Sequence, residues 1–173
     1  VAGNTSASCS FSVTVTDVQS PTVACPSNIN INTASGQCSA VVTYNVTSGD
    51  NCPGQSVNQT AGFASSSPFP KGITVNTFHA LDASGNTSAS CSFTVTVTDN
   101  QAPTIVSCPA NTTISTGVGT CDNTYSWSAP TVLDNCTGAT INQTAGSASG
   151  STFPKGTSNI TYTATDGSGN TAV

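Results

Sequence analysis

Eight cysteines are the residues of this sequence best suited to covalent chemistry. They could bind a metal or form disulfides. Zinc is disfavoured, because no two cysteines have CxxC spacing and His79 is the only imidazole. One histidine and no glutamate also argue against a hydrolytic triad or a paired-carboxylate glycosidase site, so no catalytic residue is expected. Wide, recurring cysteine spacing instead predicts disulfides and an oxidising, extracellular compartment.

The acidic residues are all aspartates, and six of them occupy equivalent places in the two halves of the chain. Carboxylate and carbonyl oxygens are the ligands that Ca²⁺ takes in sets of six to eight. No cofactor is required by the sequence, but structural calcium is compatible with two sets of aspartates. These sets are Asp17, Asp50 and Asp82, and Asp99, Asp134 and Asp166. The competing interpretation is that each Asp forms an Asx turn or caps a loop.

Composition excludes several classes of function. The chain of 173 residues has two lysines and no arginine, and charged residues make up 5% of it. Without a basic stripe, phosphate binding has no electrostatic basis, so no nucleic-acid partner is expected. No apolar run approaches the roughly 20 residues of a spanning helix, so no membrane insertion is expected in this segment. Abundant Thr and Val, with few strong helix formers, predict an all-β fold.

A repeat of about 83 residues organises the chain. CSFSVTVTD at 9–17 recurs as CSFTVTVTD at 91–99, and PFPKG at 68–72 recurs as TFPKG at 152–156. Within each copy, short runs of alternating apolar and polar residues are separated by Gly, Pro and Asn. This pattern is typical of a β-sandwich.

The repeat map predicts three segments. Residues 1–17 are the final strand of a preceding repeat, and residues 18–99 make one complete domain. Residues 100–173 make a second domain that stops before its own final cysteine and final strand. Because an incomplete sandwich exposes a long apolar edge, we expect that this chain is not a free-standing unit.

Several motifs, in order, resemble the hyalin repeat, or HYR, domain. They are Cys-Pro at 25–26, an Asp before the mid-domain turn, Phe-Pro-x-Gly at 69–72, aromatic-x-Ala-x-Asp at 78–82 and Cys-x-Phe-x-Val-x-Val at 91–97. The resemblance covers nearly the whole chain. It implies tandem immunoglobulin-like or fibronectin-type-III-like β-sandwiches, in extracellular proteins associated with adhesion. It implies no common catalytic site.

The sandwich geometry leads to a disulfide prediction. The first and last strands of a sandwich start at the same pole, which predicts the pair Cys25–Cys91. The additional cysteines look like those of tandem bacterial members of the family, and we expect local pairing of them, although a straight strand would hold such partners apart. The expected local pairs are Cys38–Cys52 and Cys121–Cys136.

The two remaining cysteines have complementary surroundings. Cys9 lies in the isolated final strand, and Cys108 lies in the domain that has no such strand. We therefore predict that residues 5–16 of one copy complete the second domain of the next copy, with an inter-subunit Cys9–Cys108 disulfide. The core-filling side chains of this strand would be Phe11, Val13 and Val15. A head-to-tail contact of this kind does not close on itself and builds a filament, unless the chain is one window of a long polyprotein.

These observations predict a non-enzymatic structural or adhesive protein, secreted or displayed on a cell surface. Its partners would be copies of itself, with a surface polysaccharide or a cell-surface protein as further candidates. The alternative is a polysaccharide-binding accessory module of a secreted enzyme, which outward aromatic side chains on one face would favour. The aromatic residues instead fall at inward strand positions: Tyr44, Phe78, Phe93, Trp127 and Tyr162.

Overall fold

The computed structural model describes residues 1–173 and consists of strands and loops without any helix. The predicted all-β class is therefore confirmed. No element has the helical length and apolarity that a membrane crossing requires. The chain divides into two compact units. The first comprises Val1–Pro26, Asn45–Gly62 and Asn76–Phe93, and the second comprises Ser27–Tyr44, Phe63–Val75 and Thr94–Val173. The domain boundaries after residues 17 and 99 remain predictions.

The first unit is built on two antiparallel strand pairs. Its strands are β1 (Thr22–Ala24), β4 (Thr47–Gly49), β5 (Ser56–Ala61), most of β7 (Gly72–Leu81) and the start of β8 (Cys91–Thr98). β1 pairs with β4, and β5 pairs with β7 with a register shift near Ala61. Alternation along β7 turns Phe78 inward, where its ring stacks on Phe93 with centroids 6.2 Å apart. These two rings form the centre of the first unit's core.

The second unit contains most of the short strands. They are β2 (Ile29–Asn32), β3 (Ser39–Val42), β6 (Ser67–Pro70), β9 (Thr104–Val106), β10 (Asp122–Thr124), β11 (Thr131–Leu133), β12 (Thr140–Ala145), β13 (Thr152–Pro154), β14 (Thr161–Thr165) and β15 (Thr171–Ala172). Its sheets are β3-β6, β11-β9, β10-β13 and β12-β14-β15. In addition, β2 pairs in parallel with the part of β8 that lies in this unit, placing Ile29 opposite Val95 and Ile31 opposite Val97.

The core of the second unit follows from strict alternation in its strands. Val95 and Val97 of β8 are 0% and 2% exposed, while the threonines between them face the other side. Phe69 of β6 is also fully buried. The rings of Tyr44 and Phe63 meet it edge-on, with centroids 6.4 and 5.4 Å away.

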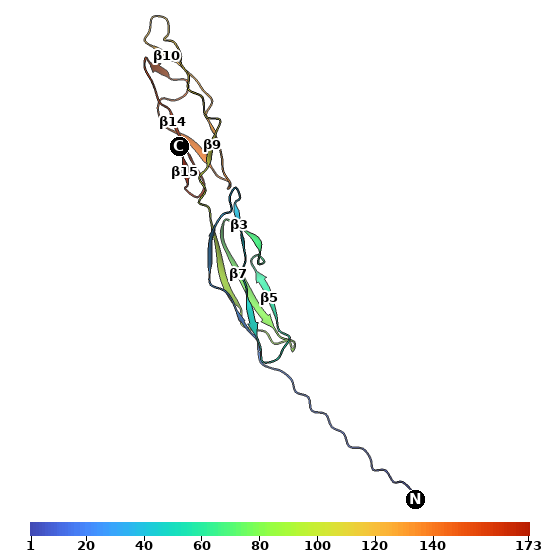
Figure 1. Ribbon diagram of the computed structural model, residues 1–173. Helices are drawn as coiled ribbons and strands as arrows, with labels where there is room; N and C mark the ends of the chain where they lie inside the picture. Colours follow the sequence, from blue (N-terminus) through green and yellow to red (C-terminus); the bar gives the residue numbers. More distant parts are fainter. The chain divides into compact units, whose positions relative to one another are not determined.

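Residues 1–16 form no strand, although their sequence nearly repeats that of β8 (Figure 1). All of them are exposed. The side chains that correspond to the buried Phe93, Val95 and Val97 are 89%, 78% and 91% exposed: Phe11, Val13 and Val15. A strand needs hydrogen-bonding neighbours as well as a suitable sequence, and these residues have none within the chain.

Two disulfides are present, and one corrects the sequence-based prediction. Cys25 bonds to Cys91, the pair expected at one pole of the sandwich. The two predicted local pairs are wrong, because Cys38 bonds instead to Cys136. Cys52 and Cys121, their expected partners, are exposed thiols, as are Cys9 and Cys108. Extended chain explains the error: β10 and β11 lie between Cys121 and Cys136, and strands separate their ends by roughly 3.3 Å per residue, whereas disulfides need Cα atoms within about 7 Å.

Candidate functional site

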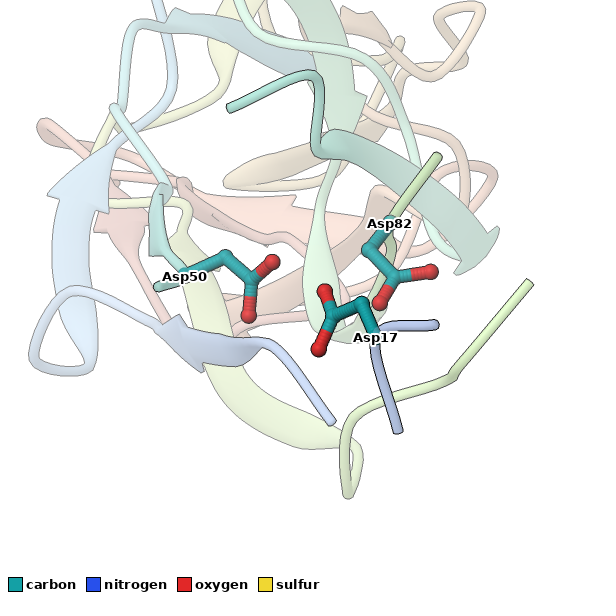
Figure 2. Close-up of side chains that lie close together, drawn as sticks. All are labelled: Asp17, Asp50 and Asp82. Atoms are coloured by element: carbon teal, nitrogen blue, oxygen red, sulfur yellow. The ribbon is translucent and has the colours of Figure 1, made fainter. Parts of the chain in front are cut away.

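Three aspartates converge at one end of the first unit (Figure 2). Asp50 directly follows β4, Asp82 directly follows β7, and Asp17 precedes β1. One carboxylate oxygen from each lies within 4.8 Å of the others. The structure thus brings together the first candidate calcium set, which we call the first triad.

Asp82 is held as the Asx-turn interpretation expects. Its Oδ1 accepts hydrogen bonds from the backbone N–H groups of Ser84 and Asn86, at 2.9 and 2.7 Å. Its Oδ2 accepts one from the Asn86 side-chain amide at 2.8 Å. The same amide donates to the carbonyl of Asp17 at 3.2 Å, which fixes Asp17 beside Asp82.

The other two carboxylates of the first triad are incompletely hydrogen-bonded. Asp17 Oδ1 accepts from the Gln19 N–H at 3.0 Å and the Asn51 side-chain amide at 3.4 Å, and Asp50 Oδ2 accepts from the Cys52 N–H at 3.3 Å. Asp17 Oδ2 and Asp50 Oδ1 are buried and have no partner. Buried carboxylate oxygens without a donor are costly, and neighbouring carboxylates repel one another. A cation at this position would relieve both effects.

The second triad, in the second unit, repeats this geometry with Asp99, Asp134 and Asp166. Asp134 follows β11 and Asp166 follows β14, and the three ligand oxygens again lie within 4.8 Å. Asp166 accepts from the N–H groups of Ser168 and Asn170, both at 2.8 Å. Asp134 Oδ1 is buried without a partner, as its counterpart on Asp50 is.

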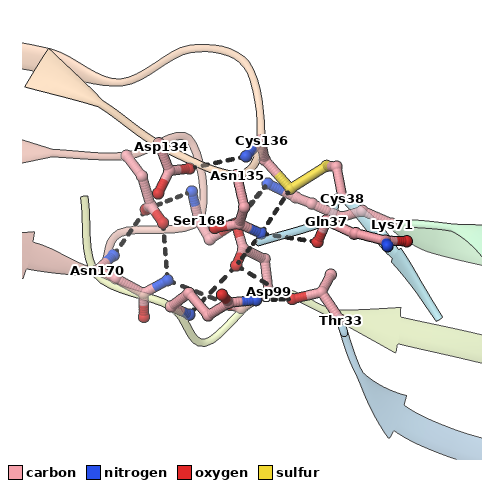
Figure 3. A network of polar contacts seen from close by, with 12 residues as sticks. Thr33, Gln37, Cys38, Lys71, Asp99, Asp134, Asn135, Cys136, Ser168 and Asn170 are labelled. Carbon is pink, nitrogen blue, oxygen red and sulfur yellow. Dashed lines mark hydrogen bonds and ion pairs between the residues drawn. A yellow bond between two sulfur atoms is a disulfide. The ribbon is translucent and has the colours of Figure 1, made fainter. Parts of the chain in front are cut away.

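The two triads differ in the surroundings of their first member. The Asp99 side chain is fully buried, and Lys71 Nζ lies 3.9 Å from its Oδ2 (Figure 3). Further donors to Asp99 are the hydroxyls of Thr33 and Ser168 at 3.4 and 3.2 Å, and the Asn135 amide at 3.2 Å. The charge of Asp99 is therefore balanced by Lys71 and its oxygens are hydrogen-bonded, whereas Asp17 has no lysine beside it. Sequence reasoning missed Lys71, whose position in the repeated Phe-Pro-Lys-Gly motif was the available signal.

Local hydrogen bonds also determine the direction of several pKa shifts. The Gln19 N–H lowers the pKa of Asp17 against the opposing effect of burial. Burial raises the pKa of Asp166, but the hydrogen bonds from Asn170, Ser168 and Gly169 outweigh it and leave the pKa lowered. A hydrogen bond to Asp17, with burial and the nearby carboxylate charges, raises the pKa of the Cys52 thiol.

The Cys38–Cys136 disulfide lies within the same network as the second triad (Figure 3). Next to it, the Asn135 amide donates to the Gln37 carbonyl at 3.0 Å. We call this group of contacts the junction. Its residues are Thr33, Gln37, Cys38 and Lys71 on one side, and Asp99, Asn135, Cys136 and Ser168 on the other. Its disulfide joins a loop of one sequence repeat to a loop of the following repeat. The sequence did contain a signal for this pairing. Cys38 recurs as Cys121 and Cys52 recurs as Cys136, so a disulfide between these two positions can form between repeats as well as within one.

A second feature is a cavity of about 690 Å³ in the second unit. Its lining includes Cys108, Ile114 and the rings of Trp127, Phe153 and Tyr162. The Trp127 indole N–H donates to the Tyr162 hydroxyl at 2.8 Å, so the wall of the cavity is an ordered aromatic cluster. Along it, residues 112–115 are the repeat counterpart of β2, and no strand of the chain pairs with them.

Comparison with known proteins identifies the repeats. The profile of the HYR domain matches the chain twice, over residues 16–97 and 98–173. Hyalin of Strongylocentrotus purpuratus is 36% identical over 172 residues, or 96% of this chain. The "Sushi, von Willebrand factor type A, EGF and pentraxin domain-containing protein 1" of Rattus norvegicus is 37% identical over 156 residues, or 89% of this chain.

The chain spans only 14% of hyalin and 4% of the rat protein. The similarity therefore concerns the repeats and not the whole architecture of those proteins. Together, the two profile matches, the strand-only structure and the Cys25–Cys91 disulfide show that this chain belongs to the HYR domain family of immunoglobulin-like β-sandwiches.

Proposed function

We propose that this chain is a non-enzymatic, extracellular structural or adhesive protein whose copies assemble head to tail by strand complementation. The observation that carries the proposal is a match between two defects. The second unit has a cavity lined by aromatic side chains, and residues 9–16 are an unpaired segment with the sequence of a core strand. Family membership and disulfides support the extracellular, adhesion-type role.

The repeat supplies a register for the proposed contact. In this chain β8 pairs in parallel with β2, with Val95 opposite Ile29 and Val97 opposite Ile31. Shifted by one repeat, the same pairing places Val13 of one copy opposite Thr112 of the next, and Val15 opposite Ile114. Phe11, the counterpart of the buried Phe93, then points into the aromatic cavity. Burial of these apolar side chains would drive the association.

The free cysteines agree with the same register. Cys9 and Cys108 are the repeat counterparts of Cys91 and Cys25, which are bonded to each other. Both free thiols are exposed. The strand contact would therefore bring Cys9 and Cys108 together in the geometry of the existing disulfide and make the assembly covalent.

Deletion of residues 1–16 tests the proposal. The full chain should form head-to-tail oligomers under reducing conditions, measured by sedimentation and electron microscopy, and the deletion variant should remain monomeric. A peptide of residues 5–17 should block assembly, whereas the matched peptide with Phe11→Asp, Val13→Asp and Val15→Asp should not. Unchanged assembly of the deletion variant would refute strand complementation.

Native material would separate the two forms that such an array can take. After reduction and denaturation, separate subunits should collapse to the 17.1 kDa chain. Very large chains under the same conditions would show that the repeats belong to one polyprotein. In that case the final strand of each domain would come from the same chain, and no strand would be donated between subunits.

The polysaccharide-binding alternative has weaker support. It requires aromatic side chains on an outer face, but those of the second repeat pack on one another: Trp127 lies 6.0 Å from both Tyr125 and Phe153, centroid to centroid. In the other repeat, Phe69, Phe78 and Phe93 are buried. The strand-complementation proposal uses these same rings as a core.

We also propose that the triads bind Ca²⁺. The specific support is the pair of equivalent buried oxygens without partners, Asp50 Oδ1 and Asp134 Oδ1, together with Asp17 Oδ2. Each triad would supply three carboxylate ligands, and water or backbone carbonyls would complete the six to eight oxygens that Ca²⁺ takes. Because Lys71 already neutralises Asp99, the first triad should bind the ion more tightly than the second.

A further inference from the structure

The two cysteine positions of the junction occur in both repeats, but only one cysteine at each position is bonded. Cys38 and Cys136 are bonded to each other. Their repeat counterparts, Cys121 and Cys52, are exposed free thiols. We propose that Cys121 of one copy forms a disulfide with Cys52 of a second copy, at the same boundary as the donated strand. This inference rests on the proposed head-to-tail assembly and adds a second covalent link to it.

The loop that carries Cys52 already has the conformation of the bonded loop. The Cys136 N–H donates to Asp134 Oδ2 at 3.0 Å, and the Cys52 N–H donates to Asp50 Oδ2 at 3.3 Å. In both loops the preceding asparagine amide lies 3.5 Å from the cysteine sulfur. Cys52 therefore needs no refolding to occupy the position of Cys136, which keeps the entropic cost of bond formation low.

The loop that carries Cys121 matches the Cys38 loop just as closely. The turn before Cys38 is closed by the Ala34 N–H and the Ser39 carbonyl at 2.7 Å, and the turn before Cys121 has an equivalent bond of 2.7 Å from Gly117 to Asp122. In each loop the cysteine carbonyl accepts a hydrogen bond from the backbone N–H of the repeat's lysine. The Lys71 N–H lies 3.0 Å from the Cys38 carbonyl, and the Lys155 N–H lies 2.9 Å from the Cys121 carbonyl. Both halves of a second junction are thus preformed.

The polar partners of the junction are also present at the free ends. Lys155 corresponds to Lys71, and Asp17, whose buried Oδ2 has no partner, corresponds to Asp99. The missing interaction of Asp17 is the one that Lys71 makes with Asp99 Oδ2. The one change in sequence, Thr120 in place of Gln37, is compatible with the contact because the junction uses only the backbone carbonyl of Gln37.

The chemistry is a two-electron oxidation that a disulfide reagent can complete. The Cys121 and Cys52 thiols each lose a proton, and their sulfurs form one S–S bond. The two electrons and two protons convert one molecule of a disulfide oxidant, such as oxidised glutathione, into two thiols. Exchange proceeds through a mixed disulfide on one of the two cysteines.

Two full-length variants with complementary thiols test the link. In a C9S/C108S background, adding C52S leaves Cys121 free, and adding C121S leaves Cys52 free. Mixed in a glutathione redox buffer, the two should give a covalent dimer of twice the 17.1 kDa chain on a non-reducing denaturing gel, while each alone should run as a single chain there. Mass spectrometry should find the peptide that joins Cys121 to Cys52. The mixture is run both in calcium and in EDTA, so that a metal effect is seen separately.

The outcomes separate this inference from the proposed assembly. Oligomers that form under reducing conditions, but in which both thiols remain open to alkylation after oxidation, would overturn the disulfide and leave strand complementation intact. If reduced chains do not assemble, strand complementation is refuted. The yield of covalent heterodimer in the mixture then still tests the Cys121–Cys52 disulfide. Homodimers formed as readily as the heterodimer would also overturn it. Lys155→Ala should lower the heterodimer yield several-fold, and Lys155→Arg should restore it.

Discussion

Residues 9–16 and strand β8 carry almost the same sequence and have opposite structures. CSFSVTVT and CSFTVTVT differ only at Ser12 and Thr94. Phe93 is 2% exposed within a paired strand, whereas Phe11 is 89% exposed in a segment that pairs with nothing. The difference shows that alternation of apolar residues gives a segment the capacity to be a strand. Neighbouring strands decide whether it becomes one.

The same contrast continues one residue beyond each segment. Asp99 follows β8 and is surrounded by Lys71, Ser168 and Thr33, whereas Asp17 follows residues 9–16 and keeps a buried oxygen without a partner. The paired strand β8 and the ion-paired Asp99 thus have counterparts, residues 9–16 and Asp17, that make no such contact. Predictions can therefore be made in pairs, with the unpaired counterpart as the control.

Removing the junction disulfide should have the largest effect. Cys38→Ser with Cys136→Ser opens a loop of 98 residues, and loop-closure entropy predicts a loss of roughly 4–5 kcal/mol in the free energy of unfolding. The control, Cys52→Ser with Cys121→Ser, removes two free thiols and should leave the stability of the monomer unchanged. Guanidinium unfolding monitored by Trp127 fluorescence would measure both. Equal losses in the two variants would mean that the Cys38–Cys136 bond adds nothing.

The two phenylalanines should respond differently to truncation. Phe93→Ala removes a buried ring that stacks on Phe78, and should lower the free energy of unfolding by about 3–4 kcal/mol. Phe11→Ala removes an exposed ring, so monomer stability should not change, while the yield of head-to-tail oligomers should fall. Thermal unfolding and sedimentation velocity would measure the two effects. A destabilised Phe11→Ala monomer would indicate that residues 1–16 pack on their own chain.

The aspartates that follow these segments should differ in the same direction. Asp99→Asn leaves Lys71 and two hydroxyl donors without their buried carboxylate, which should cost about 2–3 kcal/mol. Asp17→Asn should cost clearly less in the monomer, because no lysine pairs with this residue and an amide oxygen can still accept from the Gln19 N–H and the Asn51 amide. Chemical unfolding of both variants in EDTA would test the comparison without a contribution from calcium. Similar losses would show that Lys71 does not distinguish the two sites.

Calcium should give the smallest effect and is expected to favour the first triad. Occupation at ten times the dissociation constant would stabilise a site by about 1.4 kcal/mol, seen as a higher melting temperature that EDTA reverses. Asp50→Asn should abolish binding at the first triad. Lys71→Ala should strengthen binding at the second, because it removes the competing charge. Titration calorimetry that finds no heat for the wild-type chain would remove the calcium proposal.

The amino-acid sequence alone determined the repeat, the all-β class and the family. These depend on local alternation, turn residues and motif order, all of which can be read along the chain. The two sets of aspartates could also be predicted, because equivalent aspartates recur in both repeats, directly after β4 and β7 in one and after β11 and β14 in the other. The Cys25–Cys91 pair could be predicted as well, although Cys25 directly follows β1 and only Cys91 begins a strand.

Only the tertiary structure decided which cysteine of one repeat meets which of the next, and that Lys71 neutralises Asp99 but leaves Asp17 unmatched. Sequence patterns specify what each loop offers. They do not specify which loops of successive repeats lie within the roughly 7 Å that a disulfide spans, or the 4 Å that an ion pair spans. In a chain of two similar repeats, the cysteines, lysine and aspartates that make such contacts recur at equivalent positions. The three-dimensional packing alone therefore distinguishes the bonded copy from the free one.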